Sequence, residues 1–149
     1  MSNNTTTTVI IKNANFKWAK LDKPVNPFGS GDAWEIQIYT EDMDVAQEWQ
    51  TNHINIKTRM NEDGVVEYYA NIKRWARSPK TNKEYDKPLV IDALTMPLDP
   101  SIIGNGSKGA IKAYQYPWST GGKNGISTVL VAVKVEDLVE YHPETVVDF

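Results

Sequence analysis

Hydrophobic and polar residues alternate along two stretches of the chain, and in both stretches one face carries aromatic and basic side chains. In residues 65–77 that face holds Glu67, Tyr69, Asn71, Lys73, Trp75 and Arg77. In residues 109–118 it holds Lys112, Tyr114, Tyr116 and Trp118. The opposite faces are mostly apolar, with Val66, Ala70 and Ile72 in the first stretch and Ile111 and Ala113 in the second. A repeat of two residues predicts a β-strand for each stretch.

Five further stretches have strand character: residues 9–18, 33–39, 54–60, 85–93 and 126–135. The alternation in residues 33–39 places Trp34, Ile36 and Ile38 inward. The last strand is expected to place four valines on one face: Val129, Val131, Val133 and Val135. Turn-forming residues predict loops or turns at residues 20–31, 61–64, 78–83 and 119–125, the last of them a flexible connection.

One short amphipathic helix is predicted between residues 33–39 and 54–60. Thr40 is expected to cap it, because a hydroxyl group can accept a hydrogen bond from the first helical turn. Acidic residues follow at the positive end of the helix dipole: Glu41, Asp42 and Asp44. The buried side is formed by Val45, Ala46 and Trp49, and the helix is expected to end near Asn52.

This order of elements predicts a mainly β fold. Several short strands, turn-rich loops and one helix favour a five-stranded antiparallel barrel with one inserted α-helix. An open sandwich is the alternative fold. A parallel α/β sheet is disfavoured, because only one helical segment separates the strands.

Composition narrows the class of protein. A chain of 149 residues with 40% hydrophobic residues can build one well-buried core, so we expect one domain. The chain has no Cys, which excludes disulfides and thiolate metal sites, and only two His. Residues 1–8 resemble neither a signal peptide nor a membrane span, and we expect them to form a disordered lead on a cytoplasmic protein.

Charge is segregated along the chain, although the net charge is only −3. Residues 68–91 carry six basic and two acidic side chains, whereas residues 134–149 carry one lysine and five carboxylates. The sequence therefore combines a basic centre with an acidic end.

No catalytic motif is present. A phosphate-binding loop requires a Gly, four further residues and then Gly-Lys followed by Ser or Thr. The segment around Gly122 and Lys123 fails at both ends, with Pro117 and Asn124. Asp92 is interpreted as a turn or cap residue, and His53 as a surface residue near the helix end. We expect neither enzymatic activity nor a cofactor or metal ion.

Aromatic rings beside Lys and Arg form a surface on which single-stranded nucleic acid can stack its bases and neutralise its phosphates. The candidate nucleic-acid-binding residues are Lys17, Trp18, Tyr69, Lys73, Trp75, Arg77, Lys80, Lys112, Tyr114, Tyr116 and Trp118. The alternative is a β-rich structural or adaptor protein whose aromatic face binds a protein partner, since Tyr and Trp are also enriched at such interfaces.

Two motifs add a resemblance to a known family. The segment Ser101-Ile-Ile-Gly-Asn-Gly-Ser-Lys108 and the strand Tyr114-Gln-Tyr-Pro-Trp118 resemble the replication single-stranded DNA-binding proteins of short-tailed bacteriophages. Other landmarks follow in a similar order: a Pro-Phe-Gly loop, the acidic helix start, the turn Lys80-Thr-Asn-Lys83 and the segment Leu89-Val-Ile-Asp92. The likeness spans residues 14–141.

This resemblance implies an OB-fold barrel over residues 9–141 and an acidic tail over residues 142–149. It also implies non-specific binding of single-stranded DNA in phage replication or recombination, with Tyr116 and Trp118 as stacking residues. The tail of such proteins ends in Phe and contacts a DNA polymerase or helicase, a role that would fall to Asp148 and Phe149. Dimers occur in this family, so a homodimer is a further expectation.

Overall fold

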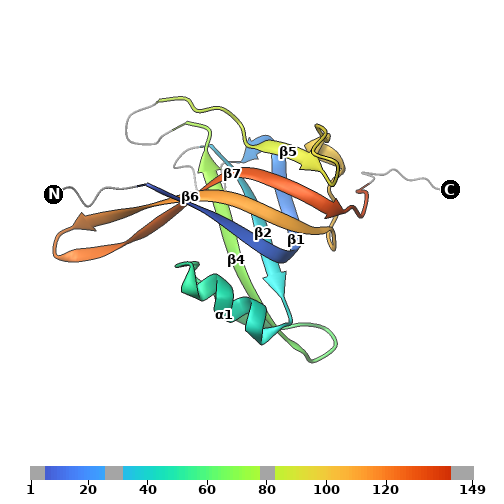
Figure 1. Cartoon of the computed structure of the whole chain (residues 1–149), viewed down its shortest axis with the longest axis horizontal. Helices are drawn as coiled ribbons and strands as arrows, with labels where there is room; N and C mark the ends of the chain where they lie inside the picture. Colours follow the sequence, from blue (N-terminus) through green and yellow to red (C-terminus); the bar gives the residue numbers. More distant parts are fainter. Residues whose placement is uncertain (1–5, 26–31, 78–82, 142–149) are drawn as a thin grey trace.

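The computed structural model describes residues 6–25, 32–77 and 83–141 (Figure 1). Its strands are β1 (Thr7–Val25), β2 (Ala33–Thr40), β3 (Lys57–Met60), β4 (Val66–Trp75), β5 (Leu89–Asp92), β6 (Lys108–Thr120) and β7 (Lys123–Asp137). The helix α1 (Met43–Thr51) lies between β2 and β3, and the short 3-10 helix η1 (Pro100–Ile102) precedes β6.

Five strands close into a barrel in the order β1, β2, β4, β7, β6 and back to β1. Strands β3 and β5 lie outside it, on β4 and β7. This arrangement is that of an OB fold, so the predicted fold class is confirmed. The closing contact between β4 and β7 is parallel, with Lys73 opposite Val129, whereas the other neighbouring barrel strands pair antiparallel.

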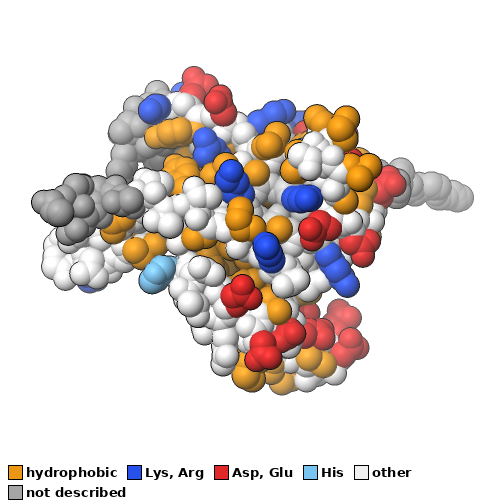
Figure 2. Space-filling model, viewed as in Figure 1, with side chains coloured by type: hydrophobic (Ala, Val, Ile, Leu, Met, Phe, Trp, Pro, Cys, Tyr) orange, Lys and Arg blue, Asp and Glu red, His pale blue; other side chains and the backbone are white. Residues whose placement is uncertain are grey.

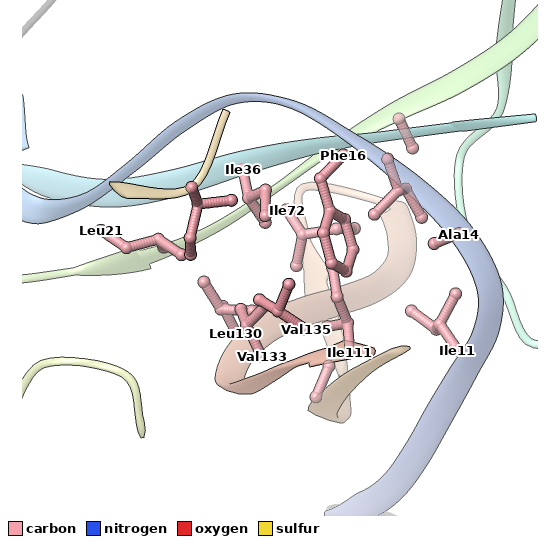
Figure 3. Close-up of a cluster of buried hydrophobic side chains, with 14 of the residues drawn as sticks. Ile11, Ala14, Phe16, Leu21, Ile36, Ile72, Ile111, Leu130, Val133 and Val135 are labelled. Atoms are coloured by element: carbon pink, nitrogen blue, oxygen red, sulfur yellow. The ribbon is translucent and has the colours of Figure 1, made fainter. Parts of the chain in front are cut away.

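The barrel interior is filled by the inward side chains of these strands. Trp34, Ile36 and Ile38 are buried, as the alternation predicts. Figure 3 shows the Phe16 ring pointing toward Ile111 inside this core. Burial of each large apolar side chain stabilises the fold by about 1.5–3 kcal/mol.

The inward face of β7 differs from the prediction. Leu130, Val133 and Val135 are buried, whereas Val129 and Val131 are only partly buried. The cause is a bulge: Ala113 lies opposite Leu130 but Lys112 lies opposite Ala132, so β7 has one extra residue there. A bulge reverses the alternation of the strand, and a run of valines at every second position gives no sign of it. The prediction of one valine face is therefore wrong.

The helix has its predicted buried side but a different cap. Asp42 is the N-cap, and its carboxylate accepts hydrogen bonds from the N–H groups of Asp44 and Val45. Thr40, the predicted cap, lies two residues before the N-cap, and its hydroxyl oxygen accepts a hydrogen bond from the N–H of Asp42 instead. Ala46 and Trp49 are buried, and Asn52 is the C-cap.

Strand boundaries also differ from the prediction. β1 begins at Thr7, within the lead, and continues to Val25, beyond the predicted strand end. The predicted flexible connection at residues 119–125 is the end of a paired hairpin, closed at Gly121 and Gly122 with φ of 57° and 82°. Positive φ at both central residues suits the tight turn of such a hairpin, and Gly adopts it without strain.

The outer part of the β6–β7 hairpin extends beyond the barrel. β1 accompanies β6 only as far as Gln115, and β4 meets β7 only at Val129. Within the part of the chain that the structure describes, residues 116–127, which we call the arm, are therefore paired only with each other. Figure 1 shows the arm projecting from one end of the barrel. Among the described residues no helix is long and apolar enough to cross a membrane.

An ion pair fastens the outer strand β3 to the barrel. Arg59 Nε donates to Glu67 Oε1 at 2.8 Å, and the Asn61 amide donates to the other carboxylate oxygen at 3.3 Å. The Arg59 guanidinium lies 4.4 Å from the Tyr69 ring centroid and 5.8 Å from that of Tyr39. Burial favours a higher pKa for the Glu67 carboxyl, but hydrogen bonds from Arg59 and Asn61 and the charge of Lys17 hold its pKa below the ordinary value.

Because the pKa of Glu67 is lowered by folding, its stabilising contribution is present above the ordinary glutamate pKa and is lost as pH falls through the lowered value. We expect Glu67→Gln to reduce the free energy of unfolding at neutral pH by about 1–3 kcal/mol, since hydrogen bonds to the charged carboxylate are lost. Urea unfolding of both proteins from pH 7 to pH 2 measures this difference.

The gap between the two proteins should narrow in acid, where wild-type Glu67 becomes protonated. A gap that stays constant over the whole pH range would contradict the ion-pair account. Glu62→Gln is the matched control, because Glu62 is an exposed carboxylate on the same hairpin.

Candidate nucleic-acid interface

The first basic and aromatic patch lies at the end of β4. Ala70 and Ile72 are directed into the barrel and buried, so Lys73 and Trp75 are directed outward. Lys73 is exposed, Trp75 is half-buried, and the Lys73 Nζ lies 4.5 Å from the Trp75 ring centroid. Arg77 is also exposed and forms a surface ion pair with Glu84 at 3.7 Å. These three predicted residues therefore lie together on one surface.

The second patch is a row of rings along β6 and the arm. Ile111, Ala113 and Gln115 are buried, so the residues between them are directed outward, as predicted. Tyr114 and Tyr116 have ring centroids 6.2 Å apart with planes tilted by 32°. Tyr116 is 39% exposed and Trp118 is 41% exposed. Lys112 is exposed at the base of the row.

A glycine on β7 leaves space for the outermost ring of the row, that of Trp118. Gly125 lies opposite Trp118, and a Cβ atom built on Gly125 would lie 2.8 Å from the indole ring. Any other residue at this position would therefore displace the indole. The sequence analysis missed Gly125, because it placed this residue in a flexible connection where no cross-strand partner is defined.

The pairing register joins the two patches. Lys73 on β4 lies opposite Val129 on β7, and Val129 lies opposite Tyr114 on β6. Paired residues share a face of the sheet, so Lys73 and Tyr114 stand in one outward row, separated by about 10 Å across two strand spacings. The structure thus brings together residues that are far apart in the sequence.

Two predicted residues lie on the outer face with their side chains already engaged. Tyr69 is half-buried, and the Arg59 guanidinium covers its ring. Lys17 is also half-buried, and its Nζ lies 4.9 Å from the Tyr39 ring centroid. Burial is the main cause of the raised pKa of the Tyr39 hydroxyl, and the nearby Glu67 carboxylate adds to it.

Trp18 lies in a different region. It is 54% exposed and has φ of 52° at an irregularity of β1. Its backbone N–H donates to the side-chain oxygen of Asn105. Asn105 is close to the start of β6, whereas Trp118 is near the other end of this strand. Ten residues of extended strand from Lys108 to Trp118 span roughly 33 Å, so Trp18 does not join the row on the arm.

Three further predicted residues lie outside the described residues: Lys80, Asp148 and Phe149.

The glycine segment that suggested the family resemblance holds the barrel together. The Gly106 N–H donates to the carbonyl of Phe16 at 2.9 Å. The Ser107 hydroxyl donates to the carbonyl of Val139 and accepts from its N–H. A Cβ atom on Gly104 would lie 2.7 Å from that carbonyl oxygen. These contacts fasten β1 to the segment that follows β7.

One group of acidic residues lies away from the two patches. Figure 2 shows Lys and Arg side chains over the barrel strands and a group of Asp and Glu side chains around α1 and the turn after β3. This group includes Glu41, Asp42, Asp44, Glu62 and Asp63, all exposed. Such a group repels a polyanion from the N-terminal end of α1 and the turn after β3. Within the described ranges no group of His, Cys, Asp and Glu is arranged to hold a metal ion.

The sequence matches no protein-family model and no curated protein. Solved structures do match. The single-stranded DNA-binding protein from bacteriophage Enc34 in complex with ssDNA is 15% identical, with a TM-score of 0.56 over 87% of this chain and 86% of that chain. Another structure of the Enc34 protein is 16% identical, with a TM-score of 0.56 over 93% of this chain and 86% of that one.

The gp2.5 single-stranded DNA-binding protein of bacteriophage T7 is 16% identical, with a TM-score of 0.54 over 99% of this chain and 100% of that chain. The resemblance predicted from the motifs is therefore confirmed in three dimensions. At these identities the similarity establishes the fold: this chain has the barrel architecture of phage single-stranded DNA-binding proteins.

Proposed function

We propose that this protein binds single-stranded DNA without sequence preference. Bases stack on Trp118, Tyr116 and Trp75, and phosphates are neutralised by Lys73 and Lys112. The observation that carries the proposal is the continuous outward row from Lys73 to the exposed rings of the arm. The Enc34 protein with the same architecture has been observed with ssDNA, which supports it.

The exposure of the rings favours a single strand over a duplex. A ring that is about 40% exposed on a narrow arm offers a flat surface to an unpaired base, whereas the bases of a duplex already stack on each other. Arg77, Tyr114 and Lys80 extend the proposed site. The proposed site also includes Tyr69, Lys17 and Trp18, with smaller contributions. The first two side chains already contact other side chains of the protein, and Trp18 is remote from the arm.

The same proposal includes a role in phage DNA replication or recombination within the host cytoplasm. Asp148 and Phe149 would contact a DNA polymerase or helicase, and the acidic tail would compete with DNA for the basic surface. Homodimer formation belongs to the same set of expected properties. The protein itself would act without catalysis or a cofactor.

We expect Trp118→Ala and Trp75→Ala each to weaken binding to oligo-dT by about 1–3 kcal/mol, because each removes one stacking surface. Lys112→Ala should also weaken binding, but its effect should shrink as salt rises, since it removes a phosphate contact. Fluorescence titrations at several salt concentrations measure both effects.

Tyr141→Ala is the matched control, since Tyr141 is an exposed aromatic residue near the start of β6 and is not part of the proposed site. Equal affinity of the wild type for duplex and single strand would contradict the proposal. An absence of binding to either would favour the adaptor alternative, in which the rings contact a protein partner.

We expect Gly125→Ala to weaken DNA binding although it removes no side chain. The added methyl group occupies the space of the Trp118 indole and changes the orientation of the ring. In the background of Trp118→Ala the same substitution should have no further effect, which a double-mutant cycle measures. Asn124→Ala, at the neighbouring exposed position, is the control. Additive losses from the two substitutions would show that Gly125 does not act through Trp118.

We expect deletion of residues 142–149 to leave the barrel folded and to tighten binding to single-stranded DNA, most strongly at low salt. The deletion removes acidic groups that compete with phosphates, and salt screens this competition. It should also abolish association with the replication polymerase or helicase. Unchanged DNA affinity together with retained partner binding would contradict the proposed role of the tail.

A further inference from the structure

Two adjoining hollows lie beneath the arm, on the side opposite the ring row. One, of about 330 Å³, is bounded by the start of β1, the end of α1 and the arm. The other, of about 230 Å³, is bounded by residues 53–57, β4 and β7. His53 and Ile126 line both hollows, so they form one cleft between the arm and the end of α1. Tyr116 and Lys73 of the proposed stacking surface border this cleft, whereas His53, Asn55, Asn71 and Ile126 are not part of that surface.

The smaller hollow follows from the way the barrel closes. β4 and β7 meet at the single pair Lys73 and Val129 and then diverge, which leaves a wedge between them. The α1–β3 connection closes the wedge from below through His53 and Asn55. Lys73 therefore lies both at the rim of this hollow and in the outward row of the interface.

The lining of the smaller hollow suits one nucleotide. Asn55, Asn71 and Thr128 offer hydrogen-bonding groups, and Ile126 offers an apolar surface. The Asn71 side-chain oxygen accepts a hydrogen bond from Gln37 at 3.1 Å, so its amide N–H₂ remains as a donor. Pockets for drug-sized ligands typically measure about 300–1,000 Å³. A volume of about 230 Å³ is better matched to a single flat ring system, such as a nucleobase.

The backbone at His53 gives a second, independent indication. His53 has φ of 63° and follows the C-cap of α1. Its N–H donates to the carbonyl of Gln50, and the N–H of Ile54 donates to that of Trp49, which is the hydrogen-bond pattern of a Schellman motif. Glycine adopts this conformation without strain, whereas an L side chain does not. The imidazole therefore occupies a position that a turn of this kind most often gives to glycine, and the residue is exposed and lines the cleft.

Electrostatics orients a nucleotide in the cleft. The negative end of the α1 dipole faces it, and the last turn of α1 has no basic residue to offset that end. This end disfavours a phosphate and favours the N–H groups of a base. Lys57 and Lys73 lie on the β4 side of the hollow and attract the phosphate instead. The Gln115 amide donates to the carbonyl of Asn52 at 2.7 Å and fixes β6, just before the arm, to the helix end.

We propose that the hollow between His53, Asn55, Asn71 and Ile126 is a base-binding subsite for single-stranded DNA. One base leaves the ring row, enters the wedge below Lys73 and lies between Ile126 and the His53 ring. Its edge contacts the Asn55 and Asn71 amides, and its phosphate contacts Lys57 or Lys73. This inference rests on the proposed function and adds a second face of the arm to it.

The experiment uses His53→Gly in the full-length protein, because this change relieves the positive φ while it removes the ring. We expect the urea midpoint to stay the same or rise, whereas affinity for oligo-dT falls about fivefold or more, as for the loss of one stacked base. A series of oligo-dT lengths should show a binding site about one nucleotide shorter. Thr95→Gly is the matched control, since Thr95 is exposed with φ of 66° in a remote turn.

A direct readout is photocrosslinking of an oligonucleotide that contains bromodeoxyuridine. Crosslinks to residues 53–57 support the subsite. If the wild type binds oligo-dT but His53→Gly and Asn55→Ala bind equally tightly and crosslinks form only on the ring row, the subsite is overturned and the proposed function stands. If the wild type binds no single-stranded DNA, both proposals are overturned together.

Discussion

The single parallel contact between β4 and β7 is the constraint on which the rest of the interface depends. The other barrel pairings are antiparallel and extend over several residues, but here only Lys73 and Val129 meet. On one side of this pair the strands seal the core. On the other side they separate, so the arm loses its neighbours and a wedge opens beneath it. One backbone contact therefore determines where the exposed rings, the nearest lysine and the cleft lie relative to one another.

Aromatic residues serve two purposes on the outside of this barrel, and their neighbours decide which. Tyr39 and Tyr69 stand beside Arg59, whose guanidinium lies within 6 Å of both ring centroids and is held by the buried Glu67. These rings stabilise the sheet. Trp118 stands opposite a glycine on a two-stranded arm, so one face of its ring rests on the backbone and the other is accessible. Residue type alone does not distinguish these two uses, because the difference comes from the cross-strand partner.

The sequence predicted the parts of the structure that depend on local pattern. Alternation identified the outward rows of β4 and β6 and the buried side of β2, because a strand with one buried face must repeat every two residues. Alternation did not predict features that depend on contacts with another strand. The bulge in β7 and the contact of the Tyr69 ring with Arg59 depend on other segments of the chain. The cap at Asp42 is local, and the sequence offers two cap-forming residues there, Thr40 and Asp42. The cleft at His53 is formed by five separate segments, so no local pattern in the sequence indicates it.

The contact of Trp118 with Gly125 limits which sequences the turn at the tip of the arm can have. Three successive pairs, Trp118 with Gly125, Ser119 with Asn124 and Thr120 with Lys123, are set by the number of residues in the turn. An insertion or deletion of one residue in that turn would bring Asn124 or Ile126 opposite the indole, and a β-carbon would then occupy its space. Related sequences can therefore exchange the residues of this turn but must keep its length, although most surface loops tolerate insertions.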